Sequence, residues 1–187
     1  MGKALILDQV DIILADDNEH MRSLVRAMLM AFGCKKIREA RDGAEVLQLM
    51  QERVCDILVT DWVMSPLDGV ELTRMLRNSG DSPNPFVPII MISAFAERRK
   101  VFQARDSGIN EFLVKPLSAK ALYSRLVAVI DKPRSFVRTK RFFGPDRRRR
   151  KDEFMGDDKR GKTPAAEQPA MDTPMSQAEI NSLFNPK

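Results

Sequence analysis

The chain has 187 residues and a mass of 21.2 kDa, which leaves room for one domain and an appendage. Apolar residues make up 43% of it and charged residues 30%, as in a soluble protein with a buried core. No stretch reaches the roughly 18 consecutive apolar residues of a membrane span, and early acidic residues argue against a signal peptide. We therefore expect a cytoplasmic protein without a membrane partner.

The charge is unevenly divided along the chain. Residues 1–131 hold 17 basic and 18 acidic residues, whereas residues 132–187 hold 14 basic and 8 acidic residues. The net charge of +5 therefore comes from a basic appendage on a nearly neutral body.

Cys34 and Cys55 show no metal-binding spacing, so we expect buried, reduced thiols. His20 is the single histidine, which argues against a histidine-built zinc site and a Ser-His-Asp triad.

Short apolar runs alternate with amphipathic stretches between Val10 and Asp131. The predicted strands are residues 10–15, 35–40, 55–60, 88–93 and 110–115. Apolar residues at helical spacing follow each of them: Leu24, Val25, Met28, Leu29 and Phe32 before Gly33, then Val46, Leu47 and Met50, then Val70, Leu72, Met75 and Leu76, then Val101 and Phe102, then Leu122, Leu126, Val129 and Ile130. This alternation predicts an α/β fold, a doubly wound five-stranded parallel sheet of the flavodoxin-like type.

The pattern ends at Lys132-Pro133, and residues 132–187 contain 6 of the 11 prolines. We expect a flexible, mostly disordered tail here. Two segments of this tail have a character of their own, an arginine-rich segment at 138–152 and an amphipathic peptide at 175–184.

Polar residues follow four of the predicted strands: Asp16 and Asp17, Asp61, Ser93 and Lys115. Ligands of open parallel sheets bind beyond the carboxyl ends of the strands. Three converging carboxylates would repel each other, so a divalent cation bound by oxygen ligands, magnesium, would neutralise them. An ammonium and a hydroxyl group beside them could hold phosphoryl oxygens, which describes an aspartyl-phosphate site. Each residue alone could be a helix cap or part of a turn; their joint occurrence favours function.

The segments IILADDNEHMR, VTDWVMSPLDG, MISA and FLVKP resemble the receiver domains of bacterial response regulators of the chemotaxis (CheY) type, over residues 8–131. The resemblance implies that Asp61 accepts a phosphoryl group from a histidine kinase. It also implies that Asp17, Asp61 and the carbonyl group of Val63 ligate magnesium directly, and that Asp16 does so through water. Such a protein is not an enzyme beyond its own phosphorylation and dephosphorylation at Asp61.

By the same resemblance, Ser93 and Lys115 bind the phosphoryl oxygens, and the Lys115-Pro116 bond is cis. Phe112 stands where the family often has a tyrosine whose burial reports activation, so the tyrosine hydroxyl group is missing here. The family commonly has proline directly after the methionine of the D-x-x-M sequence. Ser65 takes that place, and Pro66 follows it, which changes the loop without moving Asp61.

The segment 138–152 combines eight basic residues with aromatic and acidic side chains. Arginine presents a fork to guanine, a carboxylate accepts from the guanine N1 and N2 hydrogens, and arginine and phenylalanine planes stack on bases. The candidate residues for a guanine-bearing, phosphate-rich ligand are Arg141, Phe142, Phe143, Asp146, Arg147, Arg148, Arg149, Arg150 and Asp152. The alternative is a solvated basic linker that binds nucleic acid or acidic partners non-specifically. No helix-turn-helix pattern follows, so we expect no specific DNA binding.

A receiver followed by RFFGPDRRRRKD resembles the CheY-like cyclic di-GMP effector (Cle) proteins, whose arginine-rich tails bind the dinucleotide through Arg-x-x-Asp elements. Residues 149–152 match this spacing once. The resemblance implies cyclic di-GMP as the effector ligand.

The peptide MSQAEINSLF (175–184) begins like a helix. Ser176 and Glu179 form a capping box, Met175 and Ile180 fit a hydrophobic staple, and Ile180, Leu183 and Phe184 share one face. A helix this short is unstable alone, so we expect it on the surface of the fourth helix, fifth strand and fifth helix. It resembles the N-terminal peptide with which the flagellar switch protein FliM captures phosphorylated CheY; the alternative is a frayed tail.

Two alternative functional hypotheses follow from these sequence features. The first is a signalling adaptor whose tail reads cyclic di-GMP and whose receiver docks on the flagellar motor through a FliM-like switch protein, with recruitment to the flagellar pole. The alternative is a single-domain phosphorelay or chemotaxis regulator with a non-specific basic tail.

Overall fold

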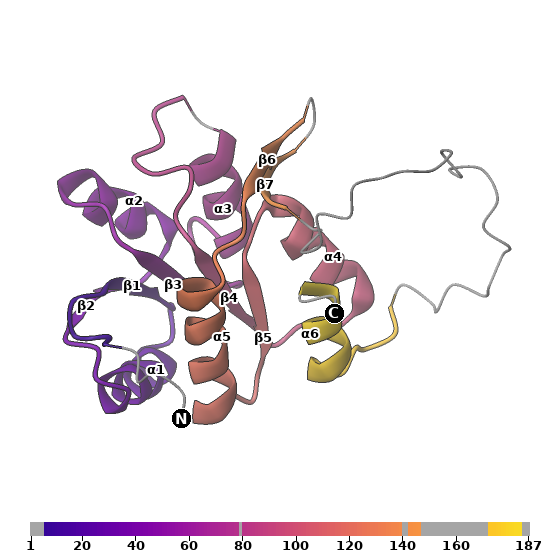
Figure 1. Ribbon diagram of the computed structural model, residues 1–187, viewed down its shortest axis with the longest axis horizontal. Coiled ribbons are helices and arrows are strands. Elements are labelled where there is room, and N and C mark those ends of the chain that lie inside the picture. Colours follow the sequence, from indigo (N-terminus) through magenta and orange to yellow (C-terminus); the bar gives the residue numbers. More distant parts are fainter. Residues whose placement is uncertain (1–5, 79, 140–141, 147–171, 185–187) are drawn as a thin grey trace, which may run out of the picture.

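The computed structural model describes residues 6–78, 80–139, 142–146 and 172–184. A five-stranded sheet runs through it in the order β2-β1-β3-β4-β5, with every neighbouring pair parallel (Figure 1). The strands are β1 (Asp11–Ala15), β2 (Lys36–Ala40), β3 (Ile57–Asp61), β4 (Ile89–Ser93) and β5 (Glu111–Val114). The predicted doubly wound, flavodoxin-like α/β fold is confirmed.

Helices cover both faces of the sheet. The helices α1 (Glu19–Ala31) and α5 (Ala119–Asp131) pack on one face. The helices α2 (Gly43–Glu52), α3 (Gly69–Asn78) and α4 (Arg98–Ser107) pack on the other (Figure 1). Because β1, β3 and β4 are buried on both faces, their sequences are nearly continuous apolar runs.

The carboxyl ends of the parallel strands meet at one edge of the sheet. Asp61 pairs in register with Ile92, and Ser93 pairs with Val114. Local sequence fixes where each helix leaves this edge: the Asn18 side chain accepts a hydrogen bond from the Met21 N–H group and caps α1. The residues that follow β1, β3, β4 and β5 therefore converge.

A hairpin follows α5, where the sequence predicted no structure in the absence of a ligand. Its strands β6 (Phe136–Arg138) and β7 (Phe143–Pro145) are antiparallel. The Phe143 ring is 8% exposed and packs edge-on against Phe86, with 5.3 Å between centroids, and beside Phe136. The aromatic residues of this charged segment thus contact the receiver body, which gives the hairpin an apolar anchor.

Two further contacts fasten the hairpin to the ends of α3 and α4. Gly144 lies so close to Gly108 that a Cβ atom at position 144 would stand 3.0 Å from the Gly108 Cα atom. The buried Arg77 donates hydrogen bonds to the carbonyl groups of Gly108, Pro85 and Val87, and its guanidinium group lies 5.0 Å from the Phe136 ring centroid. Burial lowers the pKa of Arg77 to about 9, which leaves it charged at neutral pH.

The helix α6 (Gln177–Phe184) lies on β5 beside α4 (Figure 1), on the fourth-helix and fifth-strand part of the predicted surface. Ile180 and Phe184 are buried in the cluster that also holds α2, α3 and α4 residues. The capping box is confirmed: the Glu179 carboxylate accepts from the Ser176 N–H group at 2.8 Å, and these bonds lower the pKa of Glu179. No helix in the described part of the chain is long and apolar enough to cross a membrane.

Candidate functional site

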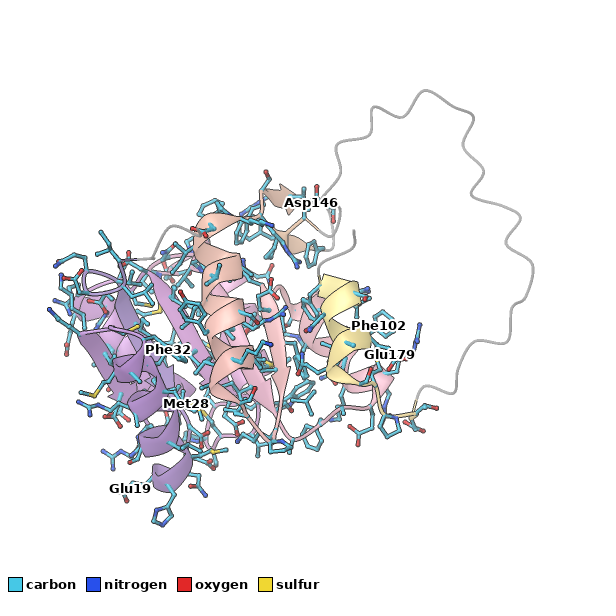
Figure 2. The ribbon with its side chains drawn as sticks, turned by 60° about the horizontal axis from the view of Figure 1, so that its bottom comes forward. Glu19, Met28, Phe32, Phe102, Asp146 and Glu179 are labelled. Atoms are coloured by element: carbon cyan, nitrogen blue, oxygen red, sulfur yellow. The ribbon has the colours of Figure 1, made fainter. Side chains whose placement is uncertain are left out.

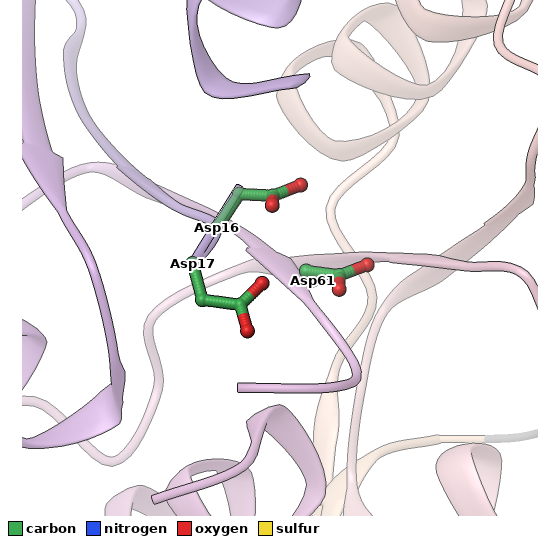
Figure 3. Close-up of side chains that lie close together, drawn as sticks. All are labelled: Asp16, Asp17 and Asp61. Carbon is green, nitrogen blue, oxygen red and sulfur yellow. The ribbon is translucent and has the colours of Figure 1, made fainter. Parts of the chain in front are cut away.

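Three carboxylates gather at the carboxyl edge of the sheet (Figure 3). Asp16 and Asp17 follow β1, and Asp61 is the last residue of β3. One oxygen atom from each lies within 4.8 Å of the other two. Asp16 and Asp61 are buried, with 2% and 6% of their surface exposed, whereas Asp17 is exposed to solvent. The sequence therefore correctly predicted that these three residues would converge.

Lys115 faces this cluster from the end of β5. Its Nζ atom lies 2.9 Å from Asp61 Oδ1 and 3.4 Å from Asp16 Oδ2. Burial by itself would lower the pKa of Lys115, but its hydrogen bond to Asp61 and the charges of Asp61 and Asp16 outweigh burial and raise that pKa. The ammonium group is therefore charged and held beside the carboxylates.

Asp61 is the central group of the cluster. Burial raises the pKa of its carboxyl group, against the lowering effect of the Lys115 ammonium group, and the neighbouring Asp16 carboxylate raises it further. Only glycine fits at position 69, because a Cβ atom there would stand 2.2 Å from the Asp61 carbonyl oxygen. The Gly69 N–H group donates to the Trp62 carbonyl group at 2.9 Å, which closes the loop after β3.

The remaining predicted residues of the receiver site lie around this cluster. Ser93 ends β4 with its side chain buried, and its Oγ atom accepts a hydrogen bond from the Phe95 N–H group. Val63 lies two residues after Asp61 with 52% of its surface exposed. The Lys115-Pro116 bond is cis, as the family resemblance implied, and Ser65-Pro66 is also cis. Carboxylate and carbonyl oxygens form the donor set for a metal ion, which suits magnesium.

An aromatic column runs from this site to the surface of β5. Trp62 follows Asp61 and packs edge-on against Phe95 and Phe112, with ring centroids 5.6 and 6.4 Å away. Phe112 is 1% exposed, and the Phe184 ring of α6 stacks on it. The position that the family resemblance marked as the aromatic switch is thus covered by the chain's own last helix.

The structure describes part of the arginine-rich segment. Phe142, Phe143 and Asp146 belong to the hairpin, and Arg138 lies with its guanidinium group 4.5 Å from the Phe143 ring centroid. Asp146 lies at the end of the hairpin (Figure 2), where its N–H group donates to the Ser135 carbonyl group. The other predicted ligand residues lie outside the described residues: Arg141, Arg147, Arg148, Arg149, Arg150 and Asp152.

Comparison with known proteins decides the family, since the family model for response regulator receiver domains matches residues 12–127. The chain belongs to the response regulator receiver family. The receiver is 30% identical to chemotaxis protein CheY-3 of Vibrio cholerae serotype O1 over 130 residues, 70% of this chain and 98% of the relative. It is a CheY-like receiver of chemotaxis and two-component signalling, a class of signalling proteins rather than of classical enzymes.

Solved structures agree with this assignment. The receiver is similar to CheY4 of Vibrio cholerae, with a TM-score of 0.58 and 27% identity over 64% of this chain and 98% of that one. It is also similar to the receiver domain of a sensor histidine kinase from Pseudomonas aeruginosa, solved with magnesium coordinated in its active-site cleft. That comparison has a TM-score of 0.59 and 26% identity over 66% of this chain and 98% of the other.

Sequence reasoning missed the polar contacts of β5 with α6 and with α5. Gln177 bonds to the backbone of β5, and the buried Glu111 carboxylate lies 2.9 Å from Arg125 and 3.6 Å from Arg134. The Arg134 guanidinium group also lies 5.9 Å from the Phe184 ring centroid. A glutamate inside a predicted buried strand was the available signal, because a buried carboxylate needs cationic partners.

Proposed function

We propose that the receiver accepts a phosphoryl group on Asp61 from a histidine kinase. The observation that carries this proposal is the geometry at the carboxyl edge: Lys115 Nζ lies 2.9 Å from Asp61 Oδ1 beside three converging carboxylates. Asp16, Asp17, Asp61 and the Val63 carbonyl group would hold magnesium, which neutralises charge on the phosphoryl oxygens when bound. Ser93 and Lys115 would bind the phosphoryl oxygens.

The transfer balances as a displacement at phosphorus. A carboxylate oxygen of Asp61 forms a new P–O bond while the P–N bond of the phosphohistidine donor breaks, and the imidazole leaves with its electron pair. Lys115 stabilises the added negative charge without giving up its proton, because an ammonium group beside anionic oxygens stays cationic. Hydrolysis of the acyl phosphate returns Asp61 to its starting state, so the protein acts only on itself.

Labelling with a small phosphodonor tests this proposal. With magnesium and acetyl phosphate, the wild-type protein should gain the mass of one phosphoryl group, and acid should preserve this group less well than it preserves a phosphoserine. Asp61→Asn should gain none. Asp68→Asn, which changes a half-buried helix-capping carboxylate at the start of α3, is the matched control and should be labelled like wild type. Wild-type labelling of Asp61→Asn would show that the acceptor lies elsewhere.

We further propose that the arginine-rich segment 138–152 binds cyclic di-GMP. Its eight basic residues, two phenylalanines and two aspartates supply phosphate binding, stacking and guanine readout together. The hairpin supports the proposal in one respect and restricts it in another. The exposed Arg138 guanidinium group already lies over an aromatic ring, a preformed stacking plane, whereas the Phe143 ring itself is buried and leaves base stacking to Phe142 and the arginines. Calorimetry with cyclic di-GMP tests the proposal.

The docked α6 helix suggests how the receiver could contact the flagellar motor. Ile180 and Phe184 occupy the apolar surface of β5, and a FliM-like switch peptide would need the same surface. The chain would then be a signalling adaptor, cytoplasmic and recruited to the flagellar pole, in which cyclic di-GMP controls docking. Deleting residues 171–187 should raise the affinity for such a peptide in a fluorescence anisotropy titration. Unchanged affinity would contradict competition for the β5 surface and favour the phosphorelay regulator with a non-specific basic tail.

A further inference from the structure

The side chain of Gln177 pairs with the backbone of β5 as a neighbouring strand would. Its Oε1 atom accepts from the Val114 N–H group at 2.8 Å, and its Nε2 atom donates to the Phe112 carbonyl group at 3.0 Å. Because β5 is the last strand in the sheet order, these two backbone groups point away from the sheet. One carboxamide thus satisfies a donor and an acceptor on the open edge.

This pairing acts on the residue next to Lys115. The Val114 N–H group is held from outside by Gln177, and the Lys115 N–H group is held from inside by the Ser93 carbonyl group at 2.8 Å. The two consecutive bonds fix the end of β5 from both sides. The Lys115 side chain leaves from this point toward Asp61 and Asp16.

The residues before α6 hold a second part of the site. We call residues 173–175 the strap. The Met175 N–H group donates to the Ala96 carbonyl group at 2.8 Å, and the Thr173 carbonyl group accepts from the Arg98 N–H group at 3.1 Å. Pro174 forms a bridge with Glu97 between these two bonds. The strap therefore pairs with the segment that leads from β4 into α4.

That segment begins at the site. Ser93, the last residue of β4, accepts the Phe95 N–H group on its Oγ atom, one residue before the first contact of the strap. Phe95 also packs on Trp62, which follows Asp61. Opposite charges also face each other between α6 and the basic helix α4, on which Figure 2 labels Glu179 and Phe102. The positive charge of Arg98 on α4 is one of the causes that lower the pKa of Glu179 on α6.

We propose that α6 and its strap position the phosphoryl site. The docked helix holds Lys115 through Gln177 and the Ser93 segment through the strap, so both groups stand ready for phosphoryl oxygens. Groups fixed before the ligand arrives bind it more tightly, because less freedom is lost on binding. By linkage, a phosphoryl group on Asp61 then stabilises the docked helix by the same factor. This inference rests on the proposed phosphorylation of Asp61.

Binding of beryllofluoride, a phosphoryl mimic, with magnesium tests the inference in the full-length chain. Trp62 is the single tryptophan and follows Asp61, so its fluorescence reports binding. We expect Gln177→Ala to weaken the apparent affinity for beryllofluoride about fivefold, as the loss of its two hydrogen bonds to β5 at a coupled site predicts. The affinity for magnesium alone, which depends on the carboxylates, should stay within a factor of about two. Ser182→Ala, on the exposed face of α6, is the matched control.

Hydrogen exchange gives the reciprocal readout. Adding magnesium and beryllofluoride to the wild type should slow exchange of the amides at 177–184. Gln177→Glu keeps an acceptor for the Val114 N–H group but sets a carboxylate oxygen against the Phe112 carbonyl group, so its affinity should fall at least as far as that of Gln177→Ala. Equal affinities in all variants, or faster exchange of α6, would overturn the inference. If the wild type bound no beryllofluoride at all, the proposed phosphorylation itself would fail instead.

Discussion

The ring of Phe184 stacks on the ring of Phe112, with centroids 6.3 Å apart and planes inclined by 11°. Phe112 lies on β5, and Phe184 is the last residue of α6. Both are about 1% exposed, so two residues far apart in sequence close one apolar contact over the sheet edge. The stability of this contact therefore determines whether α6 covers the β5 surface of the receiver.

Truncating the buried ring of α6 should release the helix. Phe184→Ala removes a side chain whose loss from a core costs about 3–5 kcal/mol, yet the receiver can stay folded while α6 detaches. The drop in unfolding free energy is therefore limited to the free energy of docking. Hydrogen exchange should show the amides at 177–184 unprotected and those of β1 and β3 unchanged. Leu183→Ala, which changes a half-buried neighbour on the same helix, should have a smaller effect.

Lys115 should carry the coupling between Asp61 and α6. In Lys115→Ala the acceptor carboxylate remains, so the protein should still gain one phosphoryl group from acetyl phosphate, at a rate lower by about a hundredfold. Beryllofluoride should no longer slow exchange of the α6 amides, because the side chain that reaches from β5 to Asp61 is gone. Lys120→Ala, on the first turn of α5, is a control of equal charge change. Wild-type coupling in Lys115→Ala would contradict the route through β5.

Guanine readout by the arginine-rich segment can be separated from simple attraction to phosphate. Asp152→Ala makes the segment more basic, so electrostatics alone predicts equal or tighter binding of cyclic di-GMP. Readout predicts weaker binding by about 1–3 kcal/mol, because an acceptor for guanine N1 and N2 is lost. Calorimetry of wild type and variant with cyclic di-GMP and cyclic di-AMP at one salt concentration decides between them. Equal binding of both dinucleotides would identify the segment as a polycation.

The close approach of two glycines should control the hairpin. Gly144→Ala places a methyl group 2.8 Å from the Phe142 ring and 3.0 Å from the Gly108 Cα atom, which is tighter than ordinary contacts. Overpacking of this kind costs about 1–3 kcal/mol, and thermal unfolding should report the loss. Gly80→Ala meets no atom within 4 Å and should leave the midpoint nearly unchanged. If both variants unfold alike, the hairpin does not contribute to the stability of the receiver.

Cys55 should resist alkylation in the folded protein. Burial raises the pKa of its thiol from about 9 to about 12, and only the thiolate reacts. At pH 9, iodoacetamide should modify the unfolded chain much faster than the native one. Between pH 9 and 12 the unfolded thiol has lost its proton and the folded thiol has kept it, so stability falls as the pH rises through this window. Fast modification of native Cys55 would show that its side chain is accessible.

The sequence predicted the sheet well because its central strands leave little ambiguity. The runs that became β1, β3 and β4 are apolar on both faces, and a residue of the site ends or directly follows each of them. The convergence of Asp16, Asp61 and Ser93 therefore followed from parallel topology alone. The strand 55–60 was placed up to two residues early, since β3 begins at Ile57, although the Asp56 N–H group already donates to the Asp11 carbonyl group of β1. Both cysteines are buried and free, as predicted.

The hairpin and the polar contacts of α6 could not be read from the sequence for a physical reason. Charge density around Phe136 and Phe143 predicted an unfolded segment, and only the tertiary position of Phe86 and Arg77 gives those rings a place to pack. Gln177 likewise looks like an ordinary surface residue of a short helix, because its partners belong to a strand more than 60 positions earlier. Contacts between residues so far apart in the sequence leave no pattern in the residues around either of them.

Because α6 is synthesised after the sheet, its docking surface is uncovered in the nascent chain. Chains leave the ribosome from their N-terminal end at about 5–20 residues per second, and domains tend to fold as they emerge. All five strands of the receiver precede α6, so the sheet can form several seconds before residues 177–184 appear. During that interval α6 does not yet contact Phe112 or the backbone of β5. A nascent receiver is thus open to any helix or strand nearby, including a neighbour on the same polysome, until its own last helix arrives.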